Sequence, residues 1–245
     1  MLAPAELVRT LERIGARGSH GVLLKAPNLP EIAAAVDRLV ARGIPVITVV
    51  TDLPGSRRQA YVGLDNRAAG ETAAYLLGQW LGRSRRAGVL VSFSSVRFQG
   101  EEECEQAFRA ALRRLHPRLR IHDVSEGHGV PDRTLRLVRD KLQAEPELAA
   151  VYSIGGANMA ILDAFAQAGR RCRCFIGHDL DDDNLALLRA GRLSAVLHHD
   201  LRHDMRRACL HLLAAHGVAG LAPPPGLSNV DVVTPFNLPE PLRGR

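Results

Sequence analysis

Apolar residues recur along the chain in two patterns: a helical spacing of three and four residues, and short continuous runs. Leu7, Leu11 and Ile14 show the first pattern, because at this spacing they share one side of a helix. Residues 45–50 show the second, a β-branched run typical of a parallel strand covered on both faces. Helices are expected over residues 4–17, 30–42, 67–82, 100–115, 131–144, 157–168, 182–190 and 201–216. Strands are expected over residues 22–24, 45–50, 61–63, 88–93, 121–124, 150–154, 174–177, 195–198 and 230–233.

Strands and helices alternate through almost the whole chain, and this order indicates the fold class. Regular alternation produces parallel sheets whose strands are joined by right-handed crossover helices. Ligands of such sheets bind at the carboxyl ends of the strands. The residues that directly follow each strand are therefore the first candidates for a binding site.

Polar side chains follow six of the predicted strands, and five of these six segments contain Asp or Asn. The segments are Thr51-Asp52, Asp65-Asn66, Ser94-Ser95-Val96-Arg97, Asn158, His178-Asp179 and His199-Asp200. Carboxylates accept hydroxyl protons, and amides both donate and accept, so such a set suits a sugar or polyol. Asp and Asn are also preferred helix N-caps, which leaves capping as a second interpretation for Asp65, Asn66 and Asp200.

Four segments resemble the effector-binding domain of the lac repressor family, whose fold is shared with ribose-type periplasmic binding proteins. They cover residues 46–48, 61–70, 177–179 and 191–197, and the resemblance extends over about residues 4–235. It implies a two-lobed α/β periplasmic-binding-protein-like fold with parallel sheets flanked by helices. The N-terminal lobe would comprise residues 1–64 and 201–229, and the C-terminal lobe residues 65–200 and 230–245, together forming one effector-binding module.

The resemblance also implies a ligand site. Asp179 matches the aspartate that binds sugar hydroxyls, and His178 beside it matches a position that is often aromatic. The other matched positions are His199, often glutamine in the family, Asn158 (or Gly156), near an asparagine contact, and Thr51 with Asp52, near a sugar-binding pair.

Two departures from the family pattern affect the expected function. Cys104 stands four residues before Phe108, where the family usually has an arginine, so Arg97 becomes the alternative source of a guanidinium and the sugar class stays open. The family's helix-turn-helix and the strand–helix–strand that follows it are not found before residue 4. The first lobe is therefore expected to be truncated at its N-terminus, through a misplaced start, a gene fragment or a remnant that pairs with another chain. Operator DNA would be bound only through a missing head.

Composition adds few constraints. The 245 residues carry a net charge of +6, but the arginines are spread over many predicted helices and form no nucleic-acid arm. The four cysteines show no paired spacing, so reduced and buried thiols are expected. No leader peptide and no apolar run of membrane-spanning length is visible, which indicates a cytoplasmic protein without membrane contact.

Catalytic and metal motifs are weak. The chain has no nucleophile elbow, Walker loop or dinucleotide fingerprint, so we expect no enzyme and no cofactor. His199 and His203 have a spacing that could bind a metal, but His199 precedes the predicted helix, and residues 181–183 are interpreted as a helix cap, so no metal is expected.

The leading hypothesis is therefore the sugar- or polyol-sensing domain of a lac-repressor-type transcription regulator. The resemblance implies a homodimer in which ligand binding closes the lobes and modulates DNA binding. The alternative is the sugar-binding protein of an ABC transporter, and an α/β enzyme is a third hypothesis.

Overall fold

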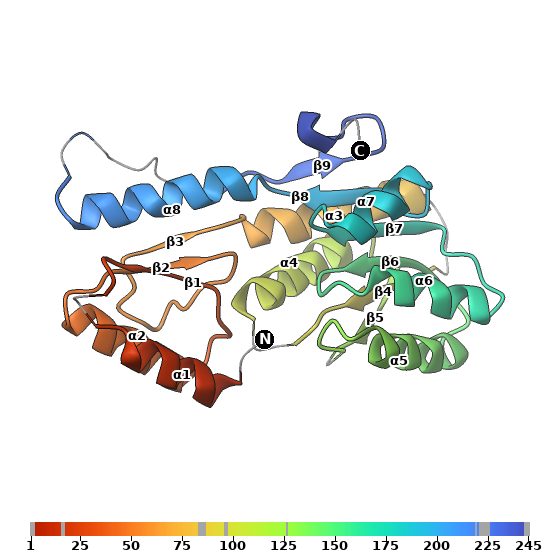
Figure 1. The fold of residues 1–245 in the computed structure, drawn as a ribbon. Helices are drawn as coiled ribbons and strands as arrows, with labels where there is room; N and C mark the ends of the chain where they lie inside the picture. The colour runs from red at the N-terminus through yellow and green to blue at the C-terminus, as the bar shows by residue number, and fades with distance from the viewer. Residues whose placement is uncertain are drawn as a thin grey trace. The chain divides into compact units, whose positions relative to one another are not determined.

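The protein is described by a computed structural model for residues 3–15, 18–82, 87–95, 98–125, 127–218, 220 and 226–242. The chain forms two compact units, whose elements can be followed in Figure 1. Unit 1 comprises Met1–Asp65, Arg97–Gly100 and Asp200–Asn229. Unit 2 comprises Asn66–Val96, Glu101–His199 and Val230–Arg245. Segments that are far apart in the sequence therefore share one unit.

Unit 1 is built on a three-stranded parallel sheet in the order β1 (Val22–Leu24), β2 (Val46–Val49) and β3 (Ala60–Val62). Every residue of the central strand β2 is buried, as its β-branched sequence predicts. Val46 packs in a core with helices α1 (Pro4–Arg13) and α2 (Pro30–Ala41). Ile47 and Val49 instead join Ala208 of α8 (Leu201–Ala215). Successive residues of β2 thus point to opposite, helix-covered faces.

Unit 2 is built on a six-stranded sheet in the order β5-β4-β6-β7-β8-β9. The strands are β4 (Gly88–Ser92), β5 (Arg120–Val124), β6 (Leu148–Ser153), β7 (Cys174–His178), β8 (Ala195–His198) and β9 (Asp231–Val233). The helices of this part are α3 (Asn66–Leu81), α4 (Gln99–Leu115), α5 (Pro131–Ala144), α6 (Asn158–Gln167), α7 (Asp182–Arg189) and a short 3-10 turn, Glu240–Leu242.

The main core of unit 2 lies between this sheet and helices α5, α6 and α7, where Val151, Phe165 and Phe175 are buried together. Helix α3 contacts β6 and β7, and α4 packs closely against it. Gly70 of α3 makes that approach possible, since a Cβ there would lie 2.2 Å from the carbonyl oxygen of Cys104. The glycine of the family-like segment is therefore a packing requirement between two helices.

The expected α/β fold with parallel sheets flanked by helices is confirmed, and each expected helix and strand is present within a few residues of its predicted bounds. Helix α1 is shorter than expected and ends at Arg13, because Ile14 takes an extended backbone. Strand β9 pairs with β8 in the antiparallel direction, so the sheet of unit 2 is not wholly parallel.

The expectation of buried thiols is confirmed for Cys104 and Cys174, whereas Cys172 is half-buried. Cys209 is exposed on α8, because it falls on the helix side that faces away from the sheet core. None of the described helices combines the length and apolar composition needed to cross a membrane.

Candidate functional site

Four of the predicted ligand residues lie together in unit 2, at the carboxyl ends of β6, β7 and β8. Asn158 begins helix α6 after β6, His178 ends β7 and Asp179 follows it, and His199 follows β8. The Oδ1 atom of Asp179 lies 4.0 Å from Nε2 of His199. We refer to Asn158, His178, Asp179 and His199 as the strand-end cluster.

Asn184 of helix α7, which the sequence analysis missed, holds this cluster together. Its amide nitrogen donates to the carbonyl oxygens of His178 and Asp179, at 2.8 and 2.9 Å. Its Oδ1 must then point the other way, where it accepts a hydrogen bond of 2.6 Å from Nδ2 of Asn158. Asn158 is consequently oriented with its own Oδ1 directed elsewhere.

The Oδ1 atom of Asn158 is buried, and no hydrogen-bond partner for it exists among the described residues. Burying an amide oxygen without a partner costs about 1–3 kcal/mol, so such atoms are uncommon in folded proteins. A ligand hydroxyl that donated to this oxygen would remove the cost. The atom is therefore the clearest mark of a binding site in the cluster.

Asp179 is held in a rare backbone conformation, with φ at +64°. Asp tolerates the left-handed region better than most residues, and the two hydrogen bonds from Asn184 stabilise the turn. The Asp179 side chain is 55% exposed, so its carboxylate is accessible. Strained residues of this kind concentrate at functional sites.

His178 is neutral at physiological pH. Burial lowers its pKa to about 4; the charge of Asp179 opposes this shift and His199 adds to it. Its Nε2 lies 2.7 Å from the hydroxyl oxygen of Tyr152, which in turn stacks on Phe108 with ring centroids 4.7 Å apart. Tyr152 of β6 and Phe108 of α4 thus form an aromatic pair that contacts His178 through the Tyr152 hydroxyl. The sequence analysis had assigned both residues only to secondary structure.

Cys104 contacts the same Tyr152 side chain, and it occupies the position where the family pattern has an arginine. It is 2% exposed, and its Sγ lies 3.8 Å from Oδ1 of Asn66. Burial raises the pKa of the thiol to about 12, against a hydrogen bond with Tyr152 that lowers it, so Cys104 carries no charge. Arg97, the alternative guanidinium, lies outside the described residues.

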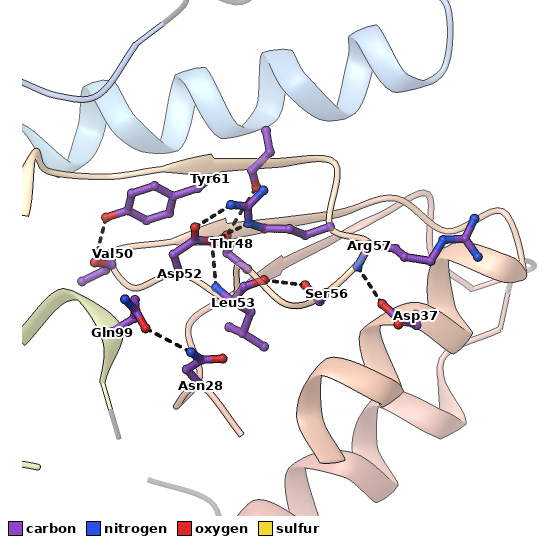
Figure 2. A network of polar contacts seen from close by, with 12 residues as sticks. Asn28, Asp37, Thr48, Val50, Asp52, Leu53, Ser56, Arg57, Tyr61 and Gln99 are labelled. Carbon is purple, nitrogen blue, oxygen red and sulfur yellow. Dashed lines mark hydrogen bonds and ion pairs between the residues drawn. The ribbon is translucent and has the colours of Figure 1, made fainter. Parts of the chain in front are cut away.

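Unit 1 positions Thr51 and Asp52 after β2. Figure 2 shows Asp52 with its contacts to Thr48 and Leu53. Asp52 is already occupied: it accepts hydrogen bonds of 2.7 Å from the Thr48 hydroxyl and the Leu53 amide, and Arg58 contacts both of its oxygens. Thr51, by contrast, has a buried hydroxyl with no hydrogen-bond partner among the described residues. Its neighbour Val50 has φ at +67°, an unusual conformation for a β-branched residue. Thr51 is therefore the more available of the two, and Asp52 orients Arg58.

Comparison with known proteins identifies the family. A family model described as "Periplasmic binding protein domain" matches residues 3–219. The chain belongs to the periplasmic binding protein domain family. No curated protein matches it.

Solved structures similar to this periplasmic binding protein domain include sugar-binding proteins and a regulator. A glucose-galactose binding protein from Geobacillus stearothermophilus has a TM-score of 0.83 and 21% identity, and the match covers 98% of this chain and 85% of that one. The Caulobacter myo-inositol binding protein, solved with myo-inositol, has a TM-score of 0.82 and 21% identity, with 96% and 80% covered. A putative LacI transcriptional regulator from Bacteroides fragilis has a TM-score of 0.79 and 18% identity, with 96% and 82% covered. At these identities the likeness establishes the fold.

Two acidic residues of this periplasmic binding protein domain act as helix caps. Asp200 accepts hydrogen bonds from the amides of Arg202 and His203, at 2.9 and 3.1 Å, and caps α8. Asp181 accepts from the amide of Asn184 at 2.7 Å and caps α7. The capping interpretation is thus confirmed for both residues.

One group of metal-ligand type, which the sequence analysis did not consider, occurs among the described residues. His122, Glu145 and Glu147 offer ligand atoms within 4.8 Å of one another. However, Nδ1 of His122 faces Glu145 at 3.4 Å while Nε2 faces Glu147 at 3.5 Å. Arg120 also lies 3.6 Å from Glu147. Each ring nitrogen thus faces a different carboxylate at the edge of the sheet, whereas a metal would gather the ligands around one ring nitrogen.

Proposed function

We propose that this periplasmic binding protein domain binds a small sugar or polyol at the strand-end cluster. The observation that carries the proposal is the buried Oδ1 of Asn158, which has no hydrogen-bond partner among the described residues, in a cluster that also holds the exposed carboxylate of Asp179. A hydroxyl-rich ligand supplies the donors that both groups need.

The chemistry of the cluster supports binding without turnover. Asn158 Oδ1 accepts one hydroxyl proton, and the Asp179 carboxylate can accept two. His178 is held neutral by burial and Cys104 is a neutral thiol, so neither is an activated nucleophile. The similar structures are named as binding proteins for glucose and galactose, arabinose, and myo-inositol, and these are all uncharged polyhydroxyl compounds.

For the cellular role, we propose a cytoplasmic, dimeric sugar sensor of the lac repressor type. Ligand binding would modulate operator binding by a DNA-reading head outside this chain. The family-like segments and the similarity to a putative LacI regulator support this role. The alternative, a sugar-binding protein of an ABC transporter, is supported by several similar structures.

The upstream coding sequence distinguishes the two roles, which would use the same ligand-binding residues. A helix-turn-helix in frame with residue 1 supports the regulator. A basic segment followed by an apolar run and a cleavage site supports the transporter component.

Thermal melting of the purified chain with pentoses, hexoses and polyols tests the binding proposal. A ligand that binds only the folded state raises the melting temperature, and at 100 times its Kd it adds about 2.7 kcal/mol of stability. We expect one stereochemical class of sugar to raise the melting temperature in proportion to the logarithm of its concentration. A cooperative melt that no sugar moves would overturn the proposal.

A further inference from the structure

A cavity of unit 2 lies at the end of the sheet opposite to the strand-end cluster. It encloses about 510 Å³, and its residues come from the end of α6 and from the segments that precede β7 and β8. The strand-end cluster occupies the carboxyl ends of these two strands, and this cavity occupies their amino ends. The two are therefore separate sites within one unit.

Arginine dominates the rim of this cavity. Arg170, Arg171, Arg173 and Arg192 line it, and none of the described residues that line it is acidic. Arg170 is fixed in place, because its guanidinium donates to the carbonyl oxygens of Leu142, Glu145, Pro146 and Leu148. The other three arginines are exposed on the rim. Several positive charges around one recess raise the local concentration of anions.

Uncharged residues line the rest of the cavity. Leu162, Phe165 and Phe175 are buried core residues, so they offer a ligand almost no accessible surface. Cys172 also lines the cavity, and burial raises the pKa of its thiol to about 12, so it adds no negative charge. A recess with a positive rim and no acidic residue among its described lining suits a small anion.

We propose that this cavity, the arginine pocket, binds the phosphate group of a small ligand. A phosphate group offers three oxygens and up to two negative charges, which planar guanidinium groups bind through paired hydrogen bonds. The pocket is independent of the proposed sugar site, since the two share no residue.

Calorimetric titration with inorganic phosphate and with phenyl phosphate tests the proposal, with benzyl alcohol as an uncharged control. We expect both phosphates to bind with an affinity that falls as salt is added, and benzyl alcohol not to bind. In the double variant Arg173→Gln, Arg192→Gln the Kd should rise about tenfold or more, because two attracting charges are lost. The matched control Arg136→Gln removes an exposed arginine of α5 outside the pocket and should leave the Kd unchanged.

Three results would overturn the proposal: no binding of phenyl phosphate, equal binding of benzyl alcohol, or an equal loss in Arg136→Gln. Urea unfolding of each variant establishes whether the variant is folded. If the double variant is unfolded, the single variant Arg192→Gln replaces it, with a smaller expected rise in Kd. A sugar-induced rise in melting temperature should be the same in wild type and in the double variant. Failure of the sugar proposal and failure of the pocket proposal are thereby separate observations.

Discussion

Asn184→Ala is expected to destabilise the protein strongly, because the Asn184 side chain links three residues of the strand-end cluster. Its side chain is 2% exposed and makes three hydrogen bonds, to Asn158, His178 and Asp179. Each bond contributes about 1 kcal/mol net, and a buried partner left unsatisfied costs about 1–3 kcal/mol. The free energy of unfolding should therefore fall by about 3–5 kcal/mol, a large share of the 5–15 kcal/mol typical of a folded domain.

Urea unfolding followed by circular dichroism measures this change, and Asn237→Ala is the matched control. Asn237 also donates one amide bond, 2.9 Å to the carbonyl oxygen of Val232, and accepts one from the amide of Thr234. It is exposed, however, so water replaces the lost bonds and the cost should stay below about 1 kcal/mol. Equal losses in the two variants would refute the reasoning, because they would show that burial of the Asn184 network contributes nothing.

Three further predictions concern pH, capping and thiol exposure. Burial keeps the pKa of His178 near 4 in the folded chain, below its unfolded value. Its contribution to stability is therefore complete above about pH 6.5 and is lost toward pH 4, at up to about 1.4 kcal/mol per pH unit. The dependence of the urea midpoint on pH over this range should be flatter in His178→Gln. Asp200→Ala should cost about 1 kcal/mol in thermal melts, because two amides at the start of α8 lose their acceptor; an unchanged melt would contradict the cap. N-ethylmaleimide should modify exposed Cys209 in the native protein and buried Cys104 only in urea, as peptide mass mapping would show, and native labelling of Cys104 would contradict its burial.

Hydrophobic periodicity was sufficient to predict the elements, because most of them bury one stripe or one whole strand. The run at residues 45–50 predicted a doubly covered strand, and β2 is buried at every position. The rule that ligands bind at strand ends also placed Asn158, Asp179 and His199 on one edge, as the structure has them.

Periodicity could not predict features that depend on long-range contacts. The direction of β9 depends on its pairing with β8, which three apolar residues do not encode. Asn184 looked like an ordinary residue in the first turn of a helix, and only the fold reveals that it binds two carbonyls at the end of β7. Asp52 looked available for a ligand, but Arg58, six residues later, occupies it.

Tyr152 and Val50 have structural features that their positions in the sequence do not indicate. Tyr152 lies in an apolar strand, which predicts a core residue, and it is fully buried. Its hydroxyl also contacts Nε2 of His178, which the apolar pattern does not predict. Val50 ends a β-branched run and gave no indication of its left-handed backbone, because that conformation is imposed by the turn into Thr51.

Calorimetric titration of D-glucose, D-galactose, D-arabinose and myo-inositol into wild type and Asp179→Asn tests the central claim most directly. Asparagine tolerates the left-handed backbone of residue 179, so the variant removes the charge of an exposed carboxylate without disturbing the turn. We predict that at least one of these compounds binds wild type and that its Kd rises about tenfold or more in Asp179→Asn, since a hydrogen bond to a charged group contributes about 1.5–3 kcal/mol. Asp163→Asn, on the exposed side of α6, should bind as wild type does. Binding that is equally strong in Asp179→Asn, or no binding of any of the four compounds, would contradict the account.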